Sequence, residues 1–171
     1  MKRVILFRHA KSSWGDPDIE DHDRPLNQRG RLAAPLMGAW LAERGYRPDL
    51  VLCSSSLRTV ETWALARRCL PQAPEAEVVP ALYHADPARM LAVVQELPET
   101  VTTALLVGHQ PGIGAFARRL AGADTPATCT RAYQKFPTAA CAVIDFDGPG
   151  WDTVAFGAGR FHSFAIPREL V

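Results

Sequence analysis

The fold of this chain is decided by the stretch LFRHAKS, residues 6–12, which completes an apolar run that begins at Val4. A short, continuous apolar run predicts a strand that is buried on both faces of a parallel sheet. Open α/β sheets bind ligands at the edge formed by the carboxyl ends of their strands. Arg8 and His9 end this strand, so the sequence predicts a cation and an imidazole at that edge. An isolated Arg-His pair, however, is more often a solvent-facing strand end.

The length and composition of the chain predict one globular domain that spans residues 1–171. The chain has 19 basic and 18 acidic residues, and this balance argues against nucleic acids and acidic membranes as partners. No apolar run approaches the roughly 20 residues of a membrane span. The apolar start is too short for a signal peptide, because Arg8 interrupts it.

The cysteines are widely spaced and form no CxxC pair. This pattern is typical of reduced thiols and argues against a zinc site. We therefore expect a cytoplasmic protein without a bound metal, and we expect it to be a monomer. The four cysteines are Cys53, Cys69, Cys129 and Cys141.

Three strand-then-helix units are predicted in series along the chain. Residues 49–53 and 103–107 are two further buried strands, and a helical pattern follows each of them. Such units are joined by right-handed crossovers and give a mostly parallel sheet. Residues 139–146 and 151–157, which flank a Gly/Pro-rich turn, are predicted to form an antiparallel hairpin at one edge of the sheet.

The first helix is predicted over residues 28–44, with Asn27 as its N-cap and Gly45 in the left-handed position that ends it. One side of this helix is expected to pack on the sheet. The residues assigned to that side are Leu32, Leu36, Ala39, Trp40 and Ala42.

A polar segment, residues 12–28, separates the first strand from this helix and is long for a plain connection. Long loops inside globular domains are often functional. Arg24 is expected to pair with a carboxylate and fix the segment in place rather than contact phosphate directly. Trp14, like Trp40 and Trp63, is expected to pack against the protein rather than stack on a substrate.

Three predicted strand ends carry groups that suit phosphate chemistry. Arginines bind phosphate oxygens bidentately, one imidazole can attack phosphorus to form a covalent phosphoenzyme, and a second can donate to an equatorial oxygen. Serine hydroxyls and the free N–H groups of a helix start add further contacts to an anion. The groups are Arg8 and His9, the serine cluster 54–56 with Arg58, and Gly108 and His109 with Gln110.

In combination and order, five stretches of the chain resemble the histidine phosphatase superfamily, the phosphoglycerate-mutase-like group. Within that group the chain is similar to the small SixA-type phosphohistidine phosphatases. The resemblance covers nearly the whole chain. The stretches are LFRHAKSSW at 6–14, DHDRPLNQRGR at 21–31, CSSSLRTVETW at 53–63, LYHAD at 82–86 and LLVGHQPGI at 105–113.

The resemblance implies a fold and a set of roles. The fold is a three-layer α/β/α sandwich with a mostly parallel central sheet. The reaction needs no metal or other cofactor. His9 is the implied nucleophile, and the implied phosphate pocket comprises Arg8, Arg58 and His109. Ser12 and Gln110, which follow the strand ends that carry these groups, are expected from the residues themselves to bind the substrate as well.

The chain departs from the superfamily pattern at two positions. Ala10 stands where the wider superfamily has Gly, and Ala81 stands where many members carry a Glu proton donor. The Ala81 difference leaves the general acid open. Candidates by proximity in the sequence are Asp16, Asp21, His22, His84 and Asp86.

The resemblance and these departures favour removal of phosphate from phosphohistidine on a protein, such as a phosphorelay or carrier domain. An imidazole leaves more readily than an alkoxide, so a missing Glu matters less for phosphohistidine than for alkyl phosphates. Two alternatives stay open: a phosphatase for small phosphoesters on the same scaffold, and a non-catalytic domain that binds phosphorylated partners.

Overall fold

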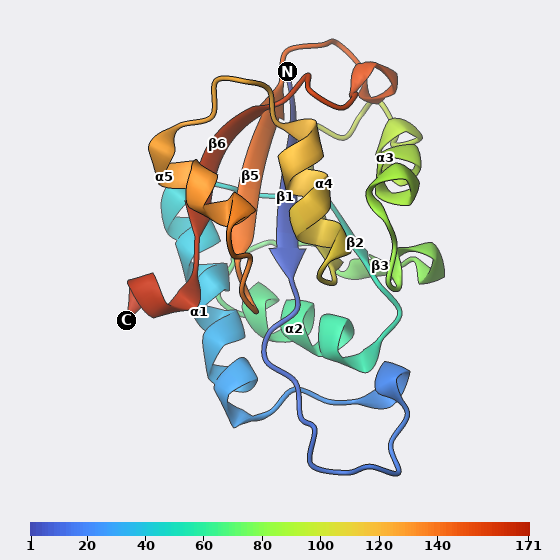
Figure 1. The fold of residues 1–171 in the computed structure, drawn as a ribbon, viewed down its shortest axis with the longest axis vertical. Coiled ribbons are helices and arrows are strands. Elements are labelled where there is room, and N and C mark those ends of the chain that lie inside the picture. The colour runs from blue at the N-terminus through green and yellow to red at the C-terminus, as the bar shows by residue number, and fades with distance from the viewer.

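The computed structural model describes residues 1–171 and is built on a six-stranded sheet (Figure 1). The strand order is β3-β2-β4-β1-β5-β6. The first four strands in this order run parallel to one another, whereas β5 is antiparallel to both β1 and β6. The strands are β1 (Lys2–Arg8), β2 (Leu50–Cys53), β3 (Ala76–Val78), β4 (Thr103–Gly108), β5 (Cys141–Phe146) and β6 (Arg160–Ala165).

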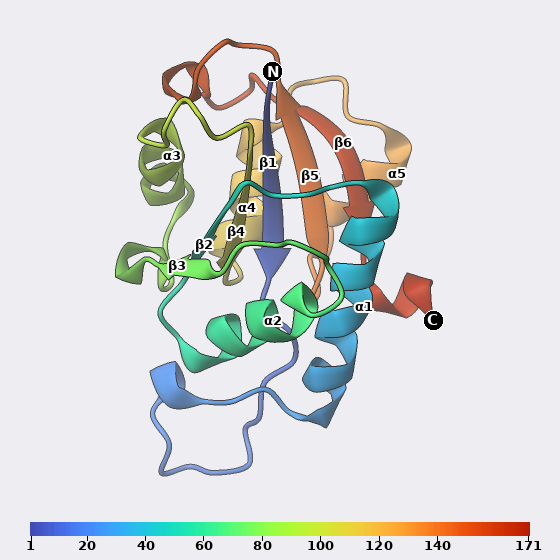
Figure 2. The same ribbon diagram turned by 180° about the vertical axis from the view of Figure 1, so that it is seen from behind.

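Helices cover both faces of the sheet, which confirms the α/β/α sandwich. Figure 2 shows α1 and α2 on one face, and Figure 1 shows α3, α4 and α5 on the other. No helix combines the length and apolar composition that a membrane crossing requires. The helices are α1 (Gln28–Arg44), α2 (Leu57–Arg67), α3 (Pro87–Gln95), α4 (Gly112–Leu120) and α5 (Ala127–Thr130), and the 3₁₀ turns are η1 (Asp21–Asp23), η2 (Pro80–Leu82), η3 (Arg131–Tyr133), η4 (Trp151–Thr153) and η5 (Pro167–Leu170).

The central strand β1 supplies side chains to two separate cores. Val4 and Leu6 belong to the core under α3, α4 and α5, whereas Ile5 and Phe7 belong to the core under α1 and α2. All four are fully buried. Successive side chains of a strand point to opposite faces, so a continuous apolar run is what a strand covered on both sides requires.

Both ends of α1 are as expected, but its buried side is not. The Asn27 side chain accepts a hydrogen bond from Gly30 N, and Gly45 ends the helix with φ 73°. Leu32, however, is 66% exposed, and Ala39 is also exposed. Of the predicted residues only Trp40 is buried, and the other buried residues of the helix are Gly30, Ala34, Met37, Gly38 and Leu41.

Two glycines explain which side of α1 packs inward. A Cβ atom at Gly38 would lie 2.0 Å from the Ala66 carbonyl oxygen on α2, and one at Gly30 would lie 2.2 Å from the Lys11 oxygen. Only glycine permits the backbone to approach this closely. Backbone contact, rather than the larger aliphatic side chains, therefore sets the rotation of the helix.

An antiparallel edge hairpin forms as expected, but the second strand predicted over residues 151–157 is wrong. Residues 151–153 form η4 instead of a strand, and β6 begins at Arg160. Trp151 is fully buried, and its indole N–H donates to the Val101 oxygen at 2.8 Å. The burial of this large side chain directs the chain away from the sheet before it returns.

The carboxyl ends of β1, β2 and β4 meet at one edge of the sheet. Arg8 pairs with Gly108 across β1 and β4, and Cys53 pairs with Val107 across β2 and β4. The residues that follow these strand ends are therefore neighbours in space, as the parallel arrangement predicts.

Candidate active site

His9 lies directly beyond β1 and is held by the backbone on both sides. Its N–H donates to the Gly108 oxygen, and its carbonyl accepts from Ala139 N, both at 3.0 Å. The ring Nδ1 lies 2.7 Å from the Ala10 oxygen. Because a carbonyl can only accept, Nδ1 carries the proton, and Nε2 keeps its lone pair.

The His9 ring is neutral at neutral pH. Burial lowers its pKa to about 4, and the charges of Arg58, Arg8 and Arg24 act in the same direction, while the bond to Ala10 opposes them. Nε2 makes no hydrogen bond within the protein. The ring therefore presents an unprotonated nitrogen to the pocket described below.

His109 follows β4 and faces His9, with the ring centroids 5.4 Å apart. Its Nε2 lies 2.7 Å from Ser54 Oγ, and its Nδ1 lies 3.4 Å from an Arg58 terminal nitrogen. Burial, followed by the charges of His9 and Arg58, lowers the pKa of His109 to about 2. The guanidinium can only donate, so in this arrangement Nδ1 accepts and Nε2–H donates to the serine hydroxyl.

Two guanidiniums flank the histidines, and Arg58 is buried whereas Arg8 is half-buried. Arg8 donates to the Phe136 oxygen at 2.9 Å, and Arg58 donates to the Asp21 oxygen at 2.6 Å and to Asp21 Oδ2 at 3.0 Å. Burial lowers the pKa of Arg8, and the charge of Arg58 lowers it further. The two guanidiniums repel each other, and a bound anion would offset this repulsion.

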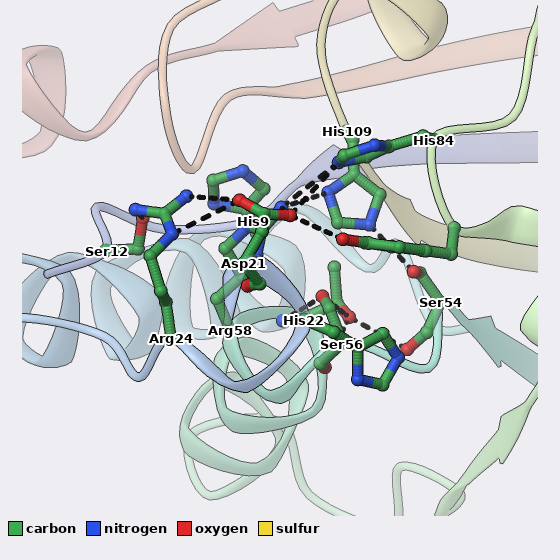
Figure 3. Close-up of polar contacts among 12 residues, drawn as sticks. His9, Ser12, Asp21, His22, Arg24, Ser54, Ser56, Arg58, His84 and His109 are labelled. Atoms are coloured by element: carbon green, nitrogen blue, oxygen red, sulfur yellow. Dashed lines mark hydrogen bonds and ion pairs between the residues drawn. The ribbon is translucent and has the colours of Figure 1, made fainter. Parts of the chain in front are cut away.

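Asp21 connects Arg58 to the polar segment (Figure 3). Arg24 donates to Asp21 Oδ1 at 3.2 Å, to Ser12 Oγ at 3.0 Å and to the Ser13 oxygen at 3.1 Å. The expected pairing of Arg24 with a carboxylate is therefore present, and it fixes the segment to the end of β1. Arg24 is itself buried and also lines the pocket.

These side chains surround an open pocket of about 330 Å³ at the edge of the sheet. Three arginines, two imidazoles with neutral rings and a serine hydroxyl converge there, a set that can bind an oxyanion and present a nucleophile to it. No group of three or more His, Cys, Asp or Glu side chains is placed to hold a metal ion. The pocket is lined by Arg8, His9, Lys11, Ser12, Trp14, Asp21, Arg24, Arg58, His84, His109, Gln110 and Thr138.

Of the five general-acid candidates, only Asp21 and His84 line the pocket. Asp16 accepts from Asp18 N in the exposed segment, and Asp86 caps α3. His22 contacts Ser55 Oγ at 2.8 Å, outside the pocket.

Asp21 is held ionised. Partial burial opposes ionisation, but hydrogen bonds from Tyr83 and Arg58 and the charges of Arg58 and Arg24 outweigh it. They hold the pKa of the Asp21 carboxyl well below its usual range. Among the five candidates, a transferable proton near the pocket can therefore reside on His84.

His84 stands at the mouth of the pocket. Its ring stacks on Tyr83 at 4.1 Å between centroids and meets His109 edge-on at 5.0 Å. Its Nε2 lies 3.3 Å from Arg58 and 3.5 Å from Asp21 Oδ2. A neutral His84 can accept from the guanidinium, and a protonated one can pair with the carboxylate.

The serine cluster, residues 54–56, was expected to bind an anion, but each of its hydroxyls makes a hydrogen bond within the protein instead. Ser54 contacts His109, Ser55 contacts His22, and Ser56 caps α2 through Thr59 N. None of the three lines the pocket. The cluster positions other side chains instead.

Trp14 does not pack as expected. It is 78% exposed and lines the pocket, with the Arg24 guanidinium 3.5 Å from the ring centroid. Trp40 and Trp63 are buried, as expected. The other predicted binding residues, Ser12 and Gln110, line the pocket, although Gln110 Oε1 also accepts from Gly114 N.

Three residues of the site were not identified from the sequence. Thr62 Oγ1 accepts from Ala10 N at 2.9 Å and so helps to place the residue after the nucleophile. Its spacing of four residues from Arg58 on α2 is a signal that could have indicated it. Tyr83 donates to Asp21, and Thr138 lines the pocket, but no local pattern predicts either contact.

The chain matches known proteins along most of its length. The family model described as histidine phosphatase superfamily, branch 1, matches residues 4–86. An uncharacterized protein of Mycobacterium tuberculosis is 38% identical over 165 residues, which are 95% of this chain and 100% of that protein. The phosphohistidine phosphatase SixA of Escherichia coli is 30% identical over 150 residues, 86% of this chain and 88% of that protein.

Two solved structures of SixA proteins are also similar to this chain. The protein histidine phosphatase SixA in complex with tungstate superposes with a TM-score of 0.80 at 28% identity, covering 99% of both chains. A crystal structure assigned to SixA from Agrobacterium tumefaciens has a TM-score of 0.81 at 30% identity, covering 97% of this chain and 98% of that one.

Proposed function

Because this chain belongs to the histidine phosphatase superfamily and is SixA-like, we propose that it removes phosphate from phosphohistidine on a protein. The reaction proceeds through a covalent intermediate on His9. The observation that carries the proposal is the state of the His9 ring, whose Nδ1–H is committed to the Ala10 oxygen while Nε2 is free. A pKa of about 4 keeps this nitrogen unprotonated and nucleophilic at neutral pH.

In the first step the lone pair of His9 Nε2 forms a bond to phosphorus, and the bond from phosphorus to the substrate nitrogen breaks. The charge on the equatorial oxygens is stabilised by Arg8 and Arg58, since both guanidiniums line the pocket with His9. His109 donates to an oxygen once its proton lies on Nδ1, and Ser54 allows this because its hydroxyl can donate to Nε2 as readily as accept from it.

The departing imidazole takes a proton as it leaves. His84 is placed to supply it, because its ring stands at the mouth of the pocket and its protonated form pairs with Asp21. In the second step water attacks the phosphorus of phospho-His9. The phosphorus–nitrogen bond breaks, inorganic phosphate forms, and Nε2 recovers its lone pair.

The absence of a Glu at position 81 favours a phosphohistidine substrate over a phosphoester, because the two substrates release different leaving groups. Ala81, at the position of the usual Glu, lies exposed on η2 and does not line the pocket. An alkoxide needs a strong, well-placed acid, which typically contributes about 10²–10⁴-fold to the rate. An imidazole is a much better leaving group once its second nitrogen is protonated.

The experiment is a comparison of catalytic efficiencies on matched substrates. A histidine-phosphorylated phosphotransfer domain is compared with glycerol phosphate and with phosphoserine, under identical conditions. We expect a higher kcat/KM on the phosphoprotein. A higher kcat/KM on either phosphoester would replace this proposal with a phosphatase for small phosphoesters.

A non-catalytic binding domain is the alternative from another class. It predicts that the phosphoprotein binds without release of phosphate and without phosphate transfer to His9. Rapid quenching during turnover separates the two, because the enzyme carries radiolabelled phosphate on His9 and the binding domain carries none.

A further inference from the structure

A second hollow lies beside the candidate active site, between α1, the η5 turn and residues 135–138. We call it the α1–η5 groove. Its volume is about 480 Å³, larger than that of the catalytic pocket. Figures 1 and 2 both show the middle of α1 close to the end of the chain.

One wall of the groove is a second, mostly apolar side of α1. Arg29, Leu32, Ala33 and Leu36 all line it, and their spacing places them on one side of the helix. This side is distinct from the one that packs against the sheet and α2. Leu32 is 66% exposed and is the most exposed leucine of the chain. The other apolar lining residues are Pro137, Ile166, Pro167 and Val171.

The rim of the groove carries four basic side chains and no acidic one. Lys11, Arg29, Lys135 and Arg168 line it, and no Asp or Glu side chain does. All four are exposed. None takes part in a side-chain hydrogen bond or ion pair within the protein, although the net charge of the whole chain is only +1. An apolar floor with unpaired cations around it is complementary to an acidic, amphipathic helix.

The groove and the catalytic pocket share a wall. Lys11 and Thr138 line both hollows. Thr138 precedes Ala139, whose N–H donates to the His9 carbonyl at 3.0 Å. A protein segment in the groove would therefore lie next to the opening through which a phosphorylated side chain reaches His9.

We propose that the α1–η5 groove docks an acidic, amphipathic helical segment of the protein that carries the phosphohistidine. This inference rests on the proposed function, and it adds how the substrate protein is recognised. The groove binds the surface of the partner while the pocket binds its phosphoryl group. The docking contacts lower KM for the phosphoprotein and have no effect on substrates that lack a protein surface.

The test measures two substrates with each variant. One is a histidine-phosphorylated phosphotransfer domain of net negative charge, and the other is phosphoramidate, which has a phosphorus–nitrogen bond and no surface. Leu32→Glu and Arg29→Glu change the floor and the rim. Val78→Glu and Arg68→Glu are matched controls, because both residues are exposed and lie outside the groove and the catalytic pocket.

For each groove variant we expect KM for the phosphoprotein to rise about tenfold, the loss that corresponds to one buried apolar or charged contact at an interface. The kcat on the phosphoprotein and both parameters on phosphoramidate should stay unchanged, and the controls should match wild type. The KM of wild type should also rise with salt, and less steeply in Arg29→Glu.

Two results would overturn the docking role while leaving the proposed function intact. In one, both groove variants keep the wild-type KM for the phosphoprotein. In the other, they lose activity on phosphoramidate as well, which would make the groove part of the catalytic structure. A wild-type protein that hydrolyses phosphoesters but not the phosphoprotein would overturn the proposed function itself, and the docking role with it.

Discussion

Activity is expected to persist at a pH where an ordinary histidine nucleophile is largely protonated. Only the neutral His9 ring attacks phosphorus. Burial and the nearby guanidiniums lower the pKa of His9 to about 4, so the neutral form persists to lower pH than it would in solution. The acid limb of kcat/KM, which reports the free enzyme, should therefore lie near this lowered pKa.

The size of the effect follows from the two pKa values. At pH 5.5 an imidazole with the ordinary pKa of about 6.5 is roughly 90% protonated, whereas one with a pKa of about 4 is roughly 3% protonated. Between pH 7.5 and 5.5 the protonation of His9 should thus leave kcat/KM almost unchanged. An ordinary histidine would reduce it about tenfold. The shift corresponds to about 3 kcal/mol in favour of the neutral ring.

The assay combines kinetics with a direct titration. The pH dependence of kcat/KM on phosphoramidate gives the acid limb, and nuclear magnetic resonance of the ring nitrogens gives the pKa of His9, which is assigned with His9→Gln. Arg58→Gln should move the pKa upward, since it removes a cation that lowers it. His162→Gln, at an exposed position outside the pocket, is the control. A His9 pKa near 6.5, or a ring protonated at Nε2 instead of Nδ1, would refute this reasoning.

Four further predictions test the roles of individual groups. His9→Ala should abolish turnover without unfolding the protein, and the phosphoenzyme of wild type should be acid-labile and alkali-stable; an alkali-labile adduct would indicate a serine or a carboxylate. Arg58→Ala should lower kcat/KM by at least about 10²-fold, the typical cost of one preorganised donor, whereas Arg68→Ala should have no effect. Activity should survive a chelator, since the arginines supply the positive charge that Mg²⁺ supplies elsewhere; loss that one divalent ion restores would contradict this. His84→Ala should slow alkyl phosphoester hydrolysis by about 10²–10⁴-fold and phosphohistidine hydrolysis less, and equal losses on both would remove it as the proton donor.

The elements that bring the site together could be predicted from the sequence because each is a local pattern. The apolar runs before His9 and His109 predict strands, the parallel arrangement follows from the helices between them, and both histidines line one pocket in the structure. The catalytic roles of these residues stay predictions. The α/β/α sandwich and the family are confirmed.

The features that could not be predicted depend on contacts between residues far apart in the sequence. A local sequence pattern carries no information about such contacts. The inward side of α1 is set by the approach of Gly38 to α2. The prediction from apolar residues was therefore right for Trp40 but wrong for Leu32 and Ala39, which are exposed. The serine cluster looked like an anion site because its partners, His109 and His22, lie far away in the sequence. Trp14 is exposed and contacts the Arg24 guanidinium, a residue ten positions away, instead of packing in a core.

The Asp21 carboxylate has a consequence for the end of the catalytic cycle. Its Oδ2 lies 3.0 Å from an Arg58 nitrogen, so this arginine has an anionic partner before any phosphate arrives. Free phosphate must share the guanidinium with a carboxylate that stays ionised, and repulsion between the two anions weakens its hold. We therefore expect free phosphate to bind more weakly than it would beside an unpaired Arg58, and to inhibit turnover only weakly.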